Sequence, residues 1–509
     1  MKPRWLCTLF LVWACMWEIQ AQEDAFSRSF YFSSFRGTIY DMLNRITERS
    51  GFLFVYDSNL IDNEKKVSVP KGNYSLREAI LLATGEKELH MKIVGQHILL
   101  YKGDIRPAPS ASGNADALSF PAAIVRGTVR EKQSGDPLPY ASVGVYQSGV
   151  GTVTNQNGDF MLKLPDTLQK STIYISYLGY EPQNISSELL LGRHTNFYLQ
   201  SRTIPLEEVI VRLVNPIGIL KEMLQKRPDN YASEPVYLTS FYREGVEKRK
   251  SLLTLTEAVF KIYKTGFQTK ARDQVKLLKM RRIYNKGAQD TLSMKIKAGV
   301  EASLMLDLVK NIPDFLTFDE YNLYHYSKID MSVVDSHLTH VIAFEQKEGI
   351  RAALYKGELY IDAENSALVA ARLEVNPQYI HRAADIFILK KSRGIKITPK
   401  KVVYTVAYKP WNGTYYISHL RGDLDFRIKR KKQIFYSPVH AWFEMAICKI
   451  DTVGVKRFPH RESLPVNKIF SETRFTYDKD FWGDFNIILP EEKLSEALFK
   501  IHSRIEEIE

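Results

Sequence analysis

The histidines of this chain are spaced in ways that do not form a zinc-peptidase site. Such a site needs three protein ligands around the ion and an open fourth position, typically from His-x-x-Glu with a later His. None of the eleven histidines is followed by Glu three residues later. The closest pair, His337 and His340, is expected at a turn between strands. His440 and Glu444 would share a strand face about 13 Å apart, too far to hold one ion together.

Other spacings associated with catalysis are also missing from the sequence. It contains no Gly-x-Ser-x-Gly nucleophile turn and no Gly-rich loop that would hold phosphate. Asn155, Asn157 and Asp159 are spaced as in a calcium loop, but no acidic ligand set follows them. The Arg-Gly-Asp tripeptide at 421–423 matches an integrin-binding sequence and is expected at a strand turn. No motif selects a catalytic, metal-binding or cofactor-binding residue, and we predict no cofactor.

Positive charge is concentrated in two stretches of a chain whose formal net charge is +12. Residues 243–286 contain many Lys and Arg against few acids, and residues 427–432 form a second basic cluster. We expect either a solvated outer strand face with a basic hairpin tip, or a surface that contacts lipopolysaccharide, anionic lipid or acidic glycan. Nucleic acid is not an expected partner, because the chain is predicted to be exported.

The amino terminus has the pattern of a signal peptide, from Met1 to Ala21. Basic residues are followed by an apolar run, Trp5 to Trp17, and by a small residue for cleavage. We expect export to the periplasm or to the periplasmic face of the outer membrane, or, alternatively, a lipoprotein anchored through Cys15. No other apolar run reaches 18 residues, so no transmembrane helix is expected. Cleavage leaves Cys448 without a partner for a disulfide within the chain.

Residues 123–211 are predicted to form a β-sandwich of about seven strands, because short alternating strands are separated by Gly, Asn, Asp and Pro turns. Asn157-Gly158 suits a tight hairpin, since both residues tolerate positive φ. The stretches VRGTV, PLPYASVGV, GTVTNQNGDF, ISYLGYE and LEEVIV closely resemble the carboxypeptidase-like regulatory (transthyretin-like) domain. That domain precedes the plug in many TonB-dependent receptors of Bacteroidetes. The resemblance implies a rigid spacer or docking module without catalytic residues.

Residues 29–103 are predicted to form a small α+β unit with two helices. Thr38 with Asp41 and Ser75 with Glu78 have the spacing of capping boxes, each followed by an apolar helical face. A strand after the first helix and a hairpin around Gly95-Gln96 complete the unit. Ile39 to Gly103 resembles the secretin and TonB short N-terminal (STN) domain. This resemblance implies a periplasmic module that docks an envelope or TonB-system protein partner.

The rest of the chain is divided by composition. Residues 104–122 are a Pro- and Ser-containing linker, 212–235 a helical connector, and 236–509 a β-rich domain that ends in a helix. About ten strands, with helical segments near 301–309 and 378–390, predict a curved antiparallel sheet or half-barrel. Fewer than 300 residues follow the regulatory segment, which is too few for the plug and barrel of a receptor.

These resemblances imply a non-enzymatic binding or accessory protein of the periplasm or outer membrane. Two alternatives stay open: an envelope hydrolase of peptidase type, and a periplasmic carrier of an apolar ligand within the curved sheet. A polar or acidic cluster in the concavity of the sheet would favour the hydrolase. A continuous apolar lining of roughly several hundred Å³ would favour the carrier.

Overall fold

The structure is a computed structural model, and it describes part of the chain. The described residues are 25–58, 60–86, 88–102, 123–202, 215–249, 251–284, 294–296, 299–319, 322–334, 337–383, 388–391, 395–431, 435–465 and 482–491. The predicted signal peptide with Cys15, the linker, the last strand of the sandwich (206–211) and the terminal helix after Glu491 lie outside them. Two compact units emerge, Met1–Thr128 with Ser186–Phe197, and Val129–Ile185 with Tyr198–Glu509.

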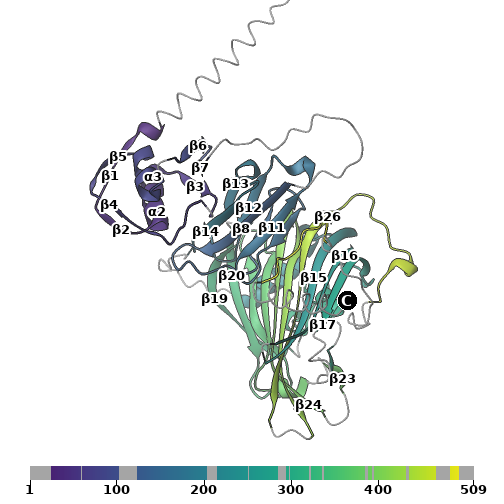
Figure 1. Cartoon of the computed structure of the whole chain (residues 1–509). Helices are drawn as coiled ribbons and strands as arrows, with labels where there is room; N and C mark the ends of the chain where they lie inside the picture. The colour runs from purple at the N-terminus through teal and green to yellow at the C-terminus, as the bar shows by residue number, and fades with distance from the viewer. Residues whose placement is uncertain are drawn as a thin grey trace, which may run out of the picture. The chain divides into compact units, whose positions relative to one another are not determined.

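The first unit contains the predicted small α+β arrangement (Figure 1). Its elements are β1 (Ser29–Phe32), β2 (Phe35–Thr38), α2 (Ile39–Ser50), β3 (Leu53–Tyr56), β4 (Lys66–Val69), β5 (Gly72–Ser75), α3 (Leu76–Thr84), β6 (His90–Val94) and β7 (His97–Tyr101). Both predicted capping boxes are confirmed, and each helix ends at a glycine in the left-handed conformation, Gly51 and Gly85. The predicted hairpin around Gly95 is also confirmed, because β6 and β7 pair antiparallel there.

The β-sandwich has seven strands in two sheets, as predicted. They are β8 (Ala123–Glu131), β9 (Ser142–Val145), β10 (Gly151–Val153), β11 (Asp159–Leu164), β12 (Thr172–Ser176), β13 (Gln183–Ser186) and β14 (His194–Leu199), ordered β10-β9-β12-β13 and β11-β8-β14. The hairpin prediction for Asn157-Gly158 is wrong, because β10 and β11 belong to different sheets and the turn connects the two layers. The Asn155 side-chain oxygen accepts hydrogen bonds from the N–H groups of Asn157 and Asp159, so it stabilises this turn from within.

A short helical connector precedes the large sheet, as the sequence predicts. It consists of α4 (Pro216–Gln225), capped by Asn215, and α5 (Arg227–Asn230). Within the described residues, no helix is long and apolar enough to cross a bilayer.

Ten antiparallel strands form the large sheet of the second unit. They are β15 (Val236–Lys248), β16 (Ser251–Lys264), β17 (Gln274–Tyr284), β19 (Tyr324–Val334), β20 (His337–Gln346), β21 (Tyr355–Asp362), β22 (Leu368–Val375), β24 (Ile395–Trp411), β25 (Thr414–Arg430) and β26 (Ser437–Asp451). Their order is β17-β16-β15-β26-β25-β24-β22-β21-β20-β19. The short strands β18 (Met294–Ile296) and β23 (Ile388–Lys391) pair separately, and α6 (Gly299–Met305) lies between β18 and β19 in sequence. A strand and a short 3-10 turn, Ile380–Ala383, therefore stand where a helix near 378–390 was expected.

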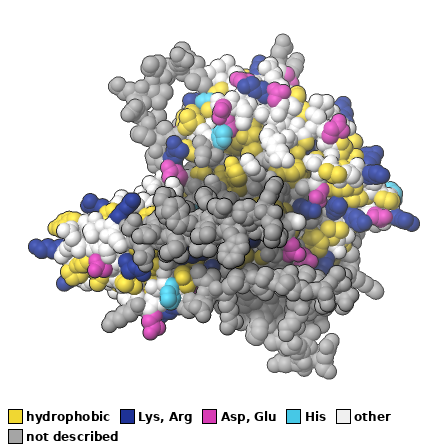
Figure 2. All heavy atoms as spheres, turned by 90° about the horizontal axis from the view of Figure 1, so that it is seen from above, with side chains coloured by type: hydrophobic (Ala, Val, Ile, Leu, Met, Phe, Trp, Pro, Cys, Tyr) yellow, Lys and Arg dark blue, Asp and Glu magenta, His cyan; other side chains and the backbone are white. Residues whose placement is uncertain are grey.

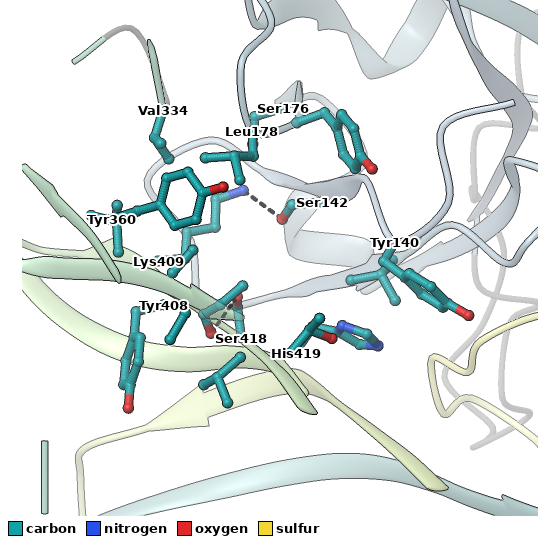
Figure 3. Close-up of a pocket in the computed structure, with 18 of the residues that line it drawn as sticks. Tyr140, Ser142, Ser176, Leu178, Val334, Tyr360, Tyr408, Lys409, Ser418 and His419 are labelled. Carbon is teal, nitrogen blue, oxygen red and sulfur yellow. Dashed lines mark hydrogen bonds between the residues drawn. The ribbon is translucent and has the colours of Figure 1, made fainter. Parts of the chain in front are cut away.

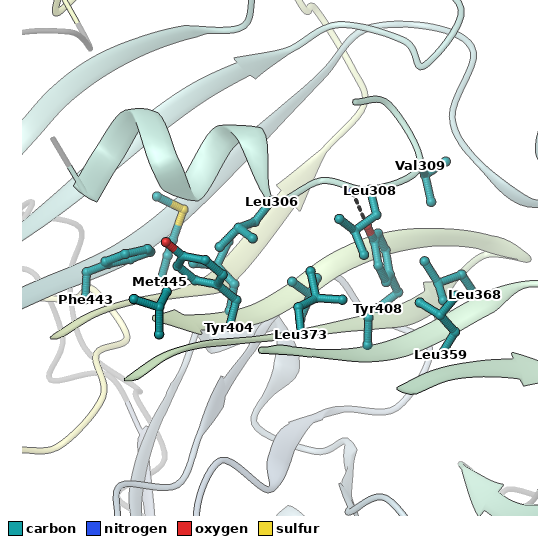
Figure 4. Close-up of a cluster of buried hydrophobic side chains, with 14 of the residues drawn as sticks. Leu306, Leu308, Val309, Leu359, Leu368, Leu373, Tyr404, Tyr408, Phe443 and Met445 are labelled. Atoms are coloured by element: carbon teal, nitrogen blue, oxygen red, sulfur yellow. Dashed lines mark hydrogen bonds between the residues drawn. The ribbon is translucent and has the colours of Figure 1, made fainter. Parts of the chain in front are cut away.

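One face of the large sheet, which we call the core face, is filled by the chain's own side chains. It is the face that carries Tyr404 and Tyr408 of β24. Figure 4 shows Leu306 and Leu308, which follow α6, directed onto the sheet beside these tyrosines. The Tyr408 hydroxyl accepts a hydrogen bond from the Leu308 backbone N–H at 2.9 Å. A cavity of about 40 Å³ lies beside Tyr408 on this face.

The opposite face, which we call the charged face, carries Thr405, Ala407 and Lys409 of β24. Over β15, β16 and β26 this face is covered by the sandwich and by residues 482–491. Trp482, Ile487 and Ile488 are buried in a cluster with Val153, Phe241, Val259, Ala446 and Cys448. Residues 482–491 are also bound to the sandwich by hydrogen bonds, among them one from the Thr152 hydroxyl to the Ile487 carbonyl at 3.0 Å.

Candidate functional site

A single line of cross-strand partners runs across the charged face, and we call it the charge row. Its members, in strand order from β21 to β17, are Glu358, Arg372, Thr405, Arg421, Glu444, Arg243, Glu257 and Arg281. Acid and base alternate along the row except at Thr405, which lies between two arginines. Adjacent strands are about 4.8 Å apart. Apart from Arg372 and Arg421, which flank Thr405, each charged member therefore has an opposite charge beside it on every neighbouring strand of the row.

The part of the charge row on β25, β26, β15 and β16 is a buried ion network. Arg243 is 1% exposed, and its guanidinium lies 2.6 Å from Glu257 and 3.2 Å from Glu444. It also donates to the carbonyl of Ile488 at 2.7 Å, which holds the covering segment. Arg421 contacts the second oxygen of Glu444 at 3.1 Å. Buried charges are tolerated only when paired in this way.

The network controls the protonation of its members. Burial acts to raise the pKa of Glu257, but Arg243 and Arg281 together hold it below its ordinary value. Burial likewise opposes the charged form of Asp423, yet hydrogen bonds from His440 and Arg421 lower its pKa to about 2. Both carboxyls are therefore ionised at neutral pH.

The Arg-Gly-Asp tripeptide does not form the predicted strand turn. It lies in the middle of β25, a single strand of 17 residues. A side-chain carbon at Gly422 would lie 2.5 Å from the Phe443 ring, so this glycine permits close packing and does not mark a turn. Arg421 donates two hydrogen bonds to Asp423, both at 2.8 Å.

The first basic stretch is largely paired, and the prediction of a solvated strand face is wrong for its buried members. Arg243 lies in the charge row, and Lys264 contacts Asp273 and Asp307 at 3.0 and 2.6 Å. Lys276 contacts Glu462 at 2.6 Å. In Figure 2, Lys and Arg side chains are scattered over the visible face among acidic, polar and apolar ones. Lys286 and Lys432 lie outside the described residues.

A cavity of about 320 Å³ lies on the charged face where β21, β22, β24 and β25 meet residues 139–178 of the sandwich. All of its lining belongs to the second unit. The described lining side chains include Arg372, Lys409 and His419, and none of them is Asp or Glu. Figure 3 shows Tyr360, Lys409 and Leu178 close together on one side of it, Tyr140 and His419 on the other, and Tyr408 pointing away.

Two alanines open this cavity. Ala370 of β22 and Ala407 of β24 are cross-strand partners, flanked in the same line by Tyr360 and His419. The small alanine side chains leave a space between the larger rings of Tyr360 and His419, which form two walls of the cavity. The two alanines form its floor. The Tyr360 hydroxyl donates to Glu358 of the charge row at 2.8 Å, which fixes one wall.

His419 is the wall residue with unused hydrogen-bonding capacity. It is 6% exposed, and its Nε2 atom is buried with no hydrogen-bond partner among the described residues. The ring stacks on Tyr140 with centroids 4.8 Å apart (Figure 3). Burial, with a smaller contribution from Arg421, lowers the pKa of His419 to about 3, so the ring is neutral at physiological pH.

Lys409 and Ser142 form the polar rim nearest the sandwich. The Lys409 ammonium donates to the Ser142 hydroxyl at 2.9 Å (Figure 3) and lies 4.6 Å from the centre of the Tyr174 ring. A hydroxyl beside an amine is one arrangement for nucleophilic catalysis, in which the amine must be neutral. The contact with the Tyr174 ring is a cation–π contact, and the same ammonium can attract an anion.

The histidines singled out from the sequence are not brought together. His337 is the first residue of β20, 3.2 Å from Glu364, whereas His340 lies within that strand and contacts Met331; the predicted turn position is wrong for His340. His440 lies beside Asp425 at 2.8 Å and Asp423 at 3.4 Å, while Glu444 belongs to the charge row. Among the described residues, no group of three His, Cys, Asp or Glu side chains could hold a metal ion.

The cavity residues were missed because no sequence signal selects them. Arg372, Thr405 and Lys409 belong to no motif, and Ser142 lies in a stretch that indicates a fold and no binding role. The register of the large sheet brings Arg372 beside Thr405, and Lys409 meets Ser142 through a hydrogen bond.

Comparison with known proteins identifies one segment. Residues 125–211 match the family model of the CarboxypepD_reg-like domain, so the regulatory β-sandwich predicted from the sequence is confirmed. A search of the curated proteins found no match.

Solved structures give only weak likenesses. A domain described as outer membrane lipoprotein-sorting, from Vibrio parahaemolyticus, is 8% identical over 48% of this chain and 96% of its own, with a TM-score of 0.22. A LolA superfamily protein from Nitrosomonas europaea is 10% identical over 49% and 96%, with a TM-score of 0.18. A DUF1329 family protein from Desulfovibrio piger is 9% identical over 48% and 96%, with a TM-score of 0.20. Scores this low support no conclusion about this chain.

Proposed function

We propose that this chain is an exported, non-enzymatic binding protein that holds a small ligand in the cavity between the sandwich and the large sheet. The observation that carries the proposal is the cavity itself, about 320 Å³ with a low alanine floor and a polar rim. Ligand sites are typically concave, mostly apolar and provided with a few oriented polar groups. The core face, in contrast, is already occupied by the chain's own side chains.

Native mass spectrometry of the full chain, purified after export, tests this role. The wild-type protein should carry a small molecule that the variant Ala370→Trp loses, because the indole fills the cavity floor. Ala352→Trp is the matched control, since Ala352 is exposed and lies outside the cavity lining. Retention of the molecule by Ala370→Trp, or its absence from the wild-type protein, would contradict the proposal.

Export and partner docking complete the proposed role. The amino-terminal pattern supports cleavage after Ala21, and sequencing of the mature protein should begin at Gln22; a lipid-modified Cys15 would instead indicate a lipoprotein. Docking through residues 29–103 is supported by the STN resemblance and by exposed apolar side chains there, including Tyr31 at 57% exposure. Tyr31→Ser should reduce cross-linking to an envelope protein, whereas Leu338→Ser, on the large sheet, should not.

An acyl hydrolase is the second candidate, because Ser142 and Lys409 are in hydrogen-bond contact at the cavity. Turnover of p-nitrophenyl butyrate that disappears in Ser142→Ala but persists in Ser148→Ala would establish it. Our proposal predicts no turnover that depends on Ser142.

A further inference from the structure

We propose that the ligand of this cavity is a small amphiphilic carboxylate, whose charged end lies over Thr405 in the charge row and whose apolar part lies on Ala370 and Ala407. This inference rests on the proposed binding function and names the chemical class of the ligand. It is carried by three features of the charged face: the break in the charge row, the sign of the charges in the lining, and the shape of the floor.

The break in the charge row is at Thr405. Its cross-strand partners are Arg372 on β22 and Arg421 on β25, so two cations flank one neutral side chain. Arg421 is already bound to Asp423 and Glu444. For Arg372 no hydrogen bond or ion pair to another described residue is found, and it lines the cavity. A carboxylate over Thr405 would restore the alternation and give Arg372 a negative charge on its second side, opposite Glu358.

Among the described residues, the charged side chains of the lining are both positive, Arg372 and Lys409. The hydroxyls of Ser142 and Thr405 add hydrogen-bond donors, whereas the Ser418 hydroxyl donates to the Ala407 carbonyl at 3.1 Å. An adjoining cavity of about 340 Å³ also includes Arg372 but mixes Lys356 with three carboxylates, Glu345, Glu358 and Glu374. The two cavities therefore differ in sign, and only the first selects an anion.

The apolar part of the ligand is defined by size and lining. At about 30 Å³ for each water-sized group, 320 Å³ holds roughly ten non-hydrogen atoms. Leu178, Val334, Ala370 and Ala407 supply apolar contacts around that volume. The unpartnered Nε2 of His419 stands at the wall, where a neutral imidazole can donate to a bound oxygen or accept from it. A medium-chain fatty acid such as octanoate, with ten non-hydrogen atoms, has these properties.

Titration calorimetry of the full chain with octanoate, octylammonium and 1-octanol tests the inference. Octanoate should bind with one site, 1-octanol at least about tenfold more weakly, and octylammonium not measurably, because a charged hydrogen bond is lost or reversed in sign. Thr405→Glu should abolish octanoate binding, since its own carboxylate occupies the break in the row. Arg372→Gln should weaken binding at least about tenfold.

Control variants distinguish this site from its surroundings. Lys356→Gln lies in the adjoining cavity only and should bind octanoate like the wild-type protein. Urea unfolding checks that each variant is folded. If Thr405→Glu does not fold, Thr405→Val replaces it in the test, because this substitution exchanges only the hydroxyl for a methyl group. Thr405→Val should bind octanoate more weakly than the wild-type protein. Equal binding of octanoate and octylammonium, unchanged binding in Thr405→Glu, or no octanoate binding to the wild-type protein would overturn the inference. If native mass spectrometry still finds a ligand that Ala370→Trp loses, the binding function stands and only the ligand class is wrong.

Discussion

The two faces of the large sheet bury their side chains by different means. The core face is closed mainly by apolar residues from α4 and from the segment after α6. The charged face is closed by ion pairs in the charge row, by the sandwich and by residues 482–491. Apolar packing adapts and fills space, whereas paired charges need fixed geometry. The cavity lined by Arg372 and Lys409 lies on the charged face, and there a ligand can bind.

The largest expected effect comes from breaking the charge row at its buried centre. Arg243→Met should lower the free energy of unfolding by about 3–5 kcal/mol, because it removes the buried cation that Glu257 and Glu444 share and leaves each carboxylate with one arginine, Arg281 or Arg421. Urea unfolding followed by circular dichroism measures the loss. Arg427→Met, at an exposed arginine of β25, should change stability by less than about 0.5 kcal/mol. Similar losses in the two variants would show that the row is not the stabilising element.

A cavity made on the core face should affect stability and leave binding intact. Leu308 is 3% exposed, so Leu308→Ala should cost about 3 kcal/mol in the free energy of unfolding. Octanoate affinity should stay within about twofold of wild type, because the site lies on the other face. Ala407→Phe should show the reverse, with binding lost and stability less affected. Loss of binding in Leu308→Ala would place the ligand on the core face.

The strand interior at 421–423 offers a smaller test of packing. Gly422→Ala should destabilise by about 1–3 kcal/mol, because the added methyl meets the Phe443 ring and overpacks the site. Thermal unfolding by calorimetry records the shift. The matched control is Ser418→Ala, which lies on β25 like Gly422 and should cost less than Gly422→Ala. Gly413→Ala cannot serve as the control, because Gly413 has φ +76 and alanine would be strained there. An unchanged thermal stability of Gly422→Ala would contradict close packing at this position and would favour the predicted turn.

The smallest effect is the opposite pH dependence of two histidines on the charged face. Asp423 raises the pKa of His440, so its stabilising contribution is complete below about pH 6.5 and is lost as pH rises through the higher folded value. The lowered pKa of His419 has the opposite consequence. The contribution of His419 to the free energy of unfolding is complete above about pH 6.5 and is lost as pH falls toward 3. His440→Gln should therefore cost a few tenths of a kcal/mol more at pH 5.5 than at pH 8.5, and His419→Leu should cost less at pH 5.5. Urea unfolding at both pH values measures these costs. A cost that is the same at pH 5.5 and pH 8.5 in both variants would contradict the opposite pKa shifts of the two histidines.

Local rules predicted local structure well. The capping boxes at Thr38 and Ser75, the hairpin at Gly95 and a helix within residues 212–235 were all predicted, because their determinants lie within a few residues of each other. The ten-strand sheet was predicted as a class, since alternation identifies strands. The position of Asn157-Gly158 between two layers was not, because turn residues do not report which sheet the next strand joins.

The site could not be predicted for the same reason. Arg372, Thr405 and Arg421 become neighbours only through the register of three long strands, one of which has a bulge at Ala407 and Tyr408. A one-residue slip would turn Thr405 to the core face. The prediction of a solvated face for residues 243–286 was wrong at its buried members for a related reason, because the acidic partners Glu444 and Glu462 lie far along the chain.

Hydrogen–deuterium exchange of the full chain with and without octanoate compares the two faces in one experiment. The account predicts slower exchange in peptides that cover residues 139–142 and 176–178, which wall the cavity, and unchanged exchange in residues 299–316, which cover the core face. Protection of 299–316, or no protection at the cavity wall under conditions where octanoate binds, would contradict it.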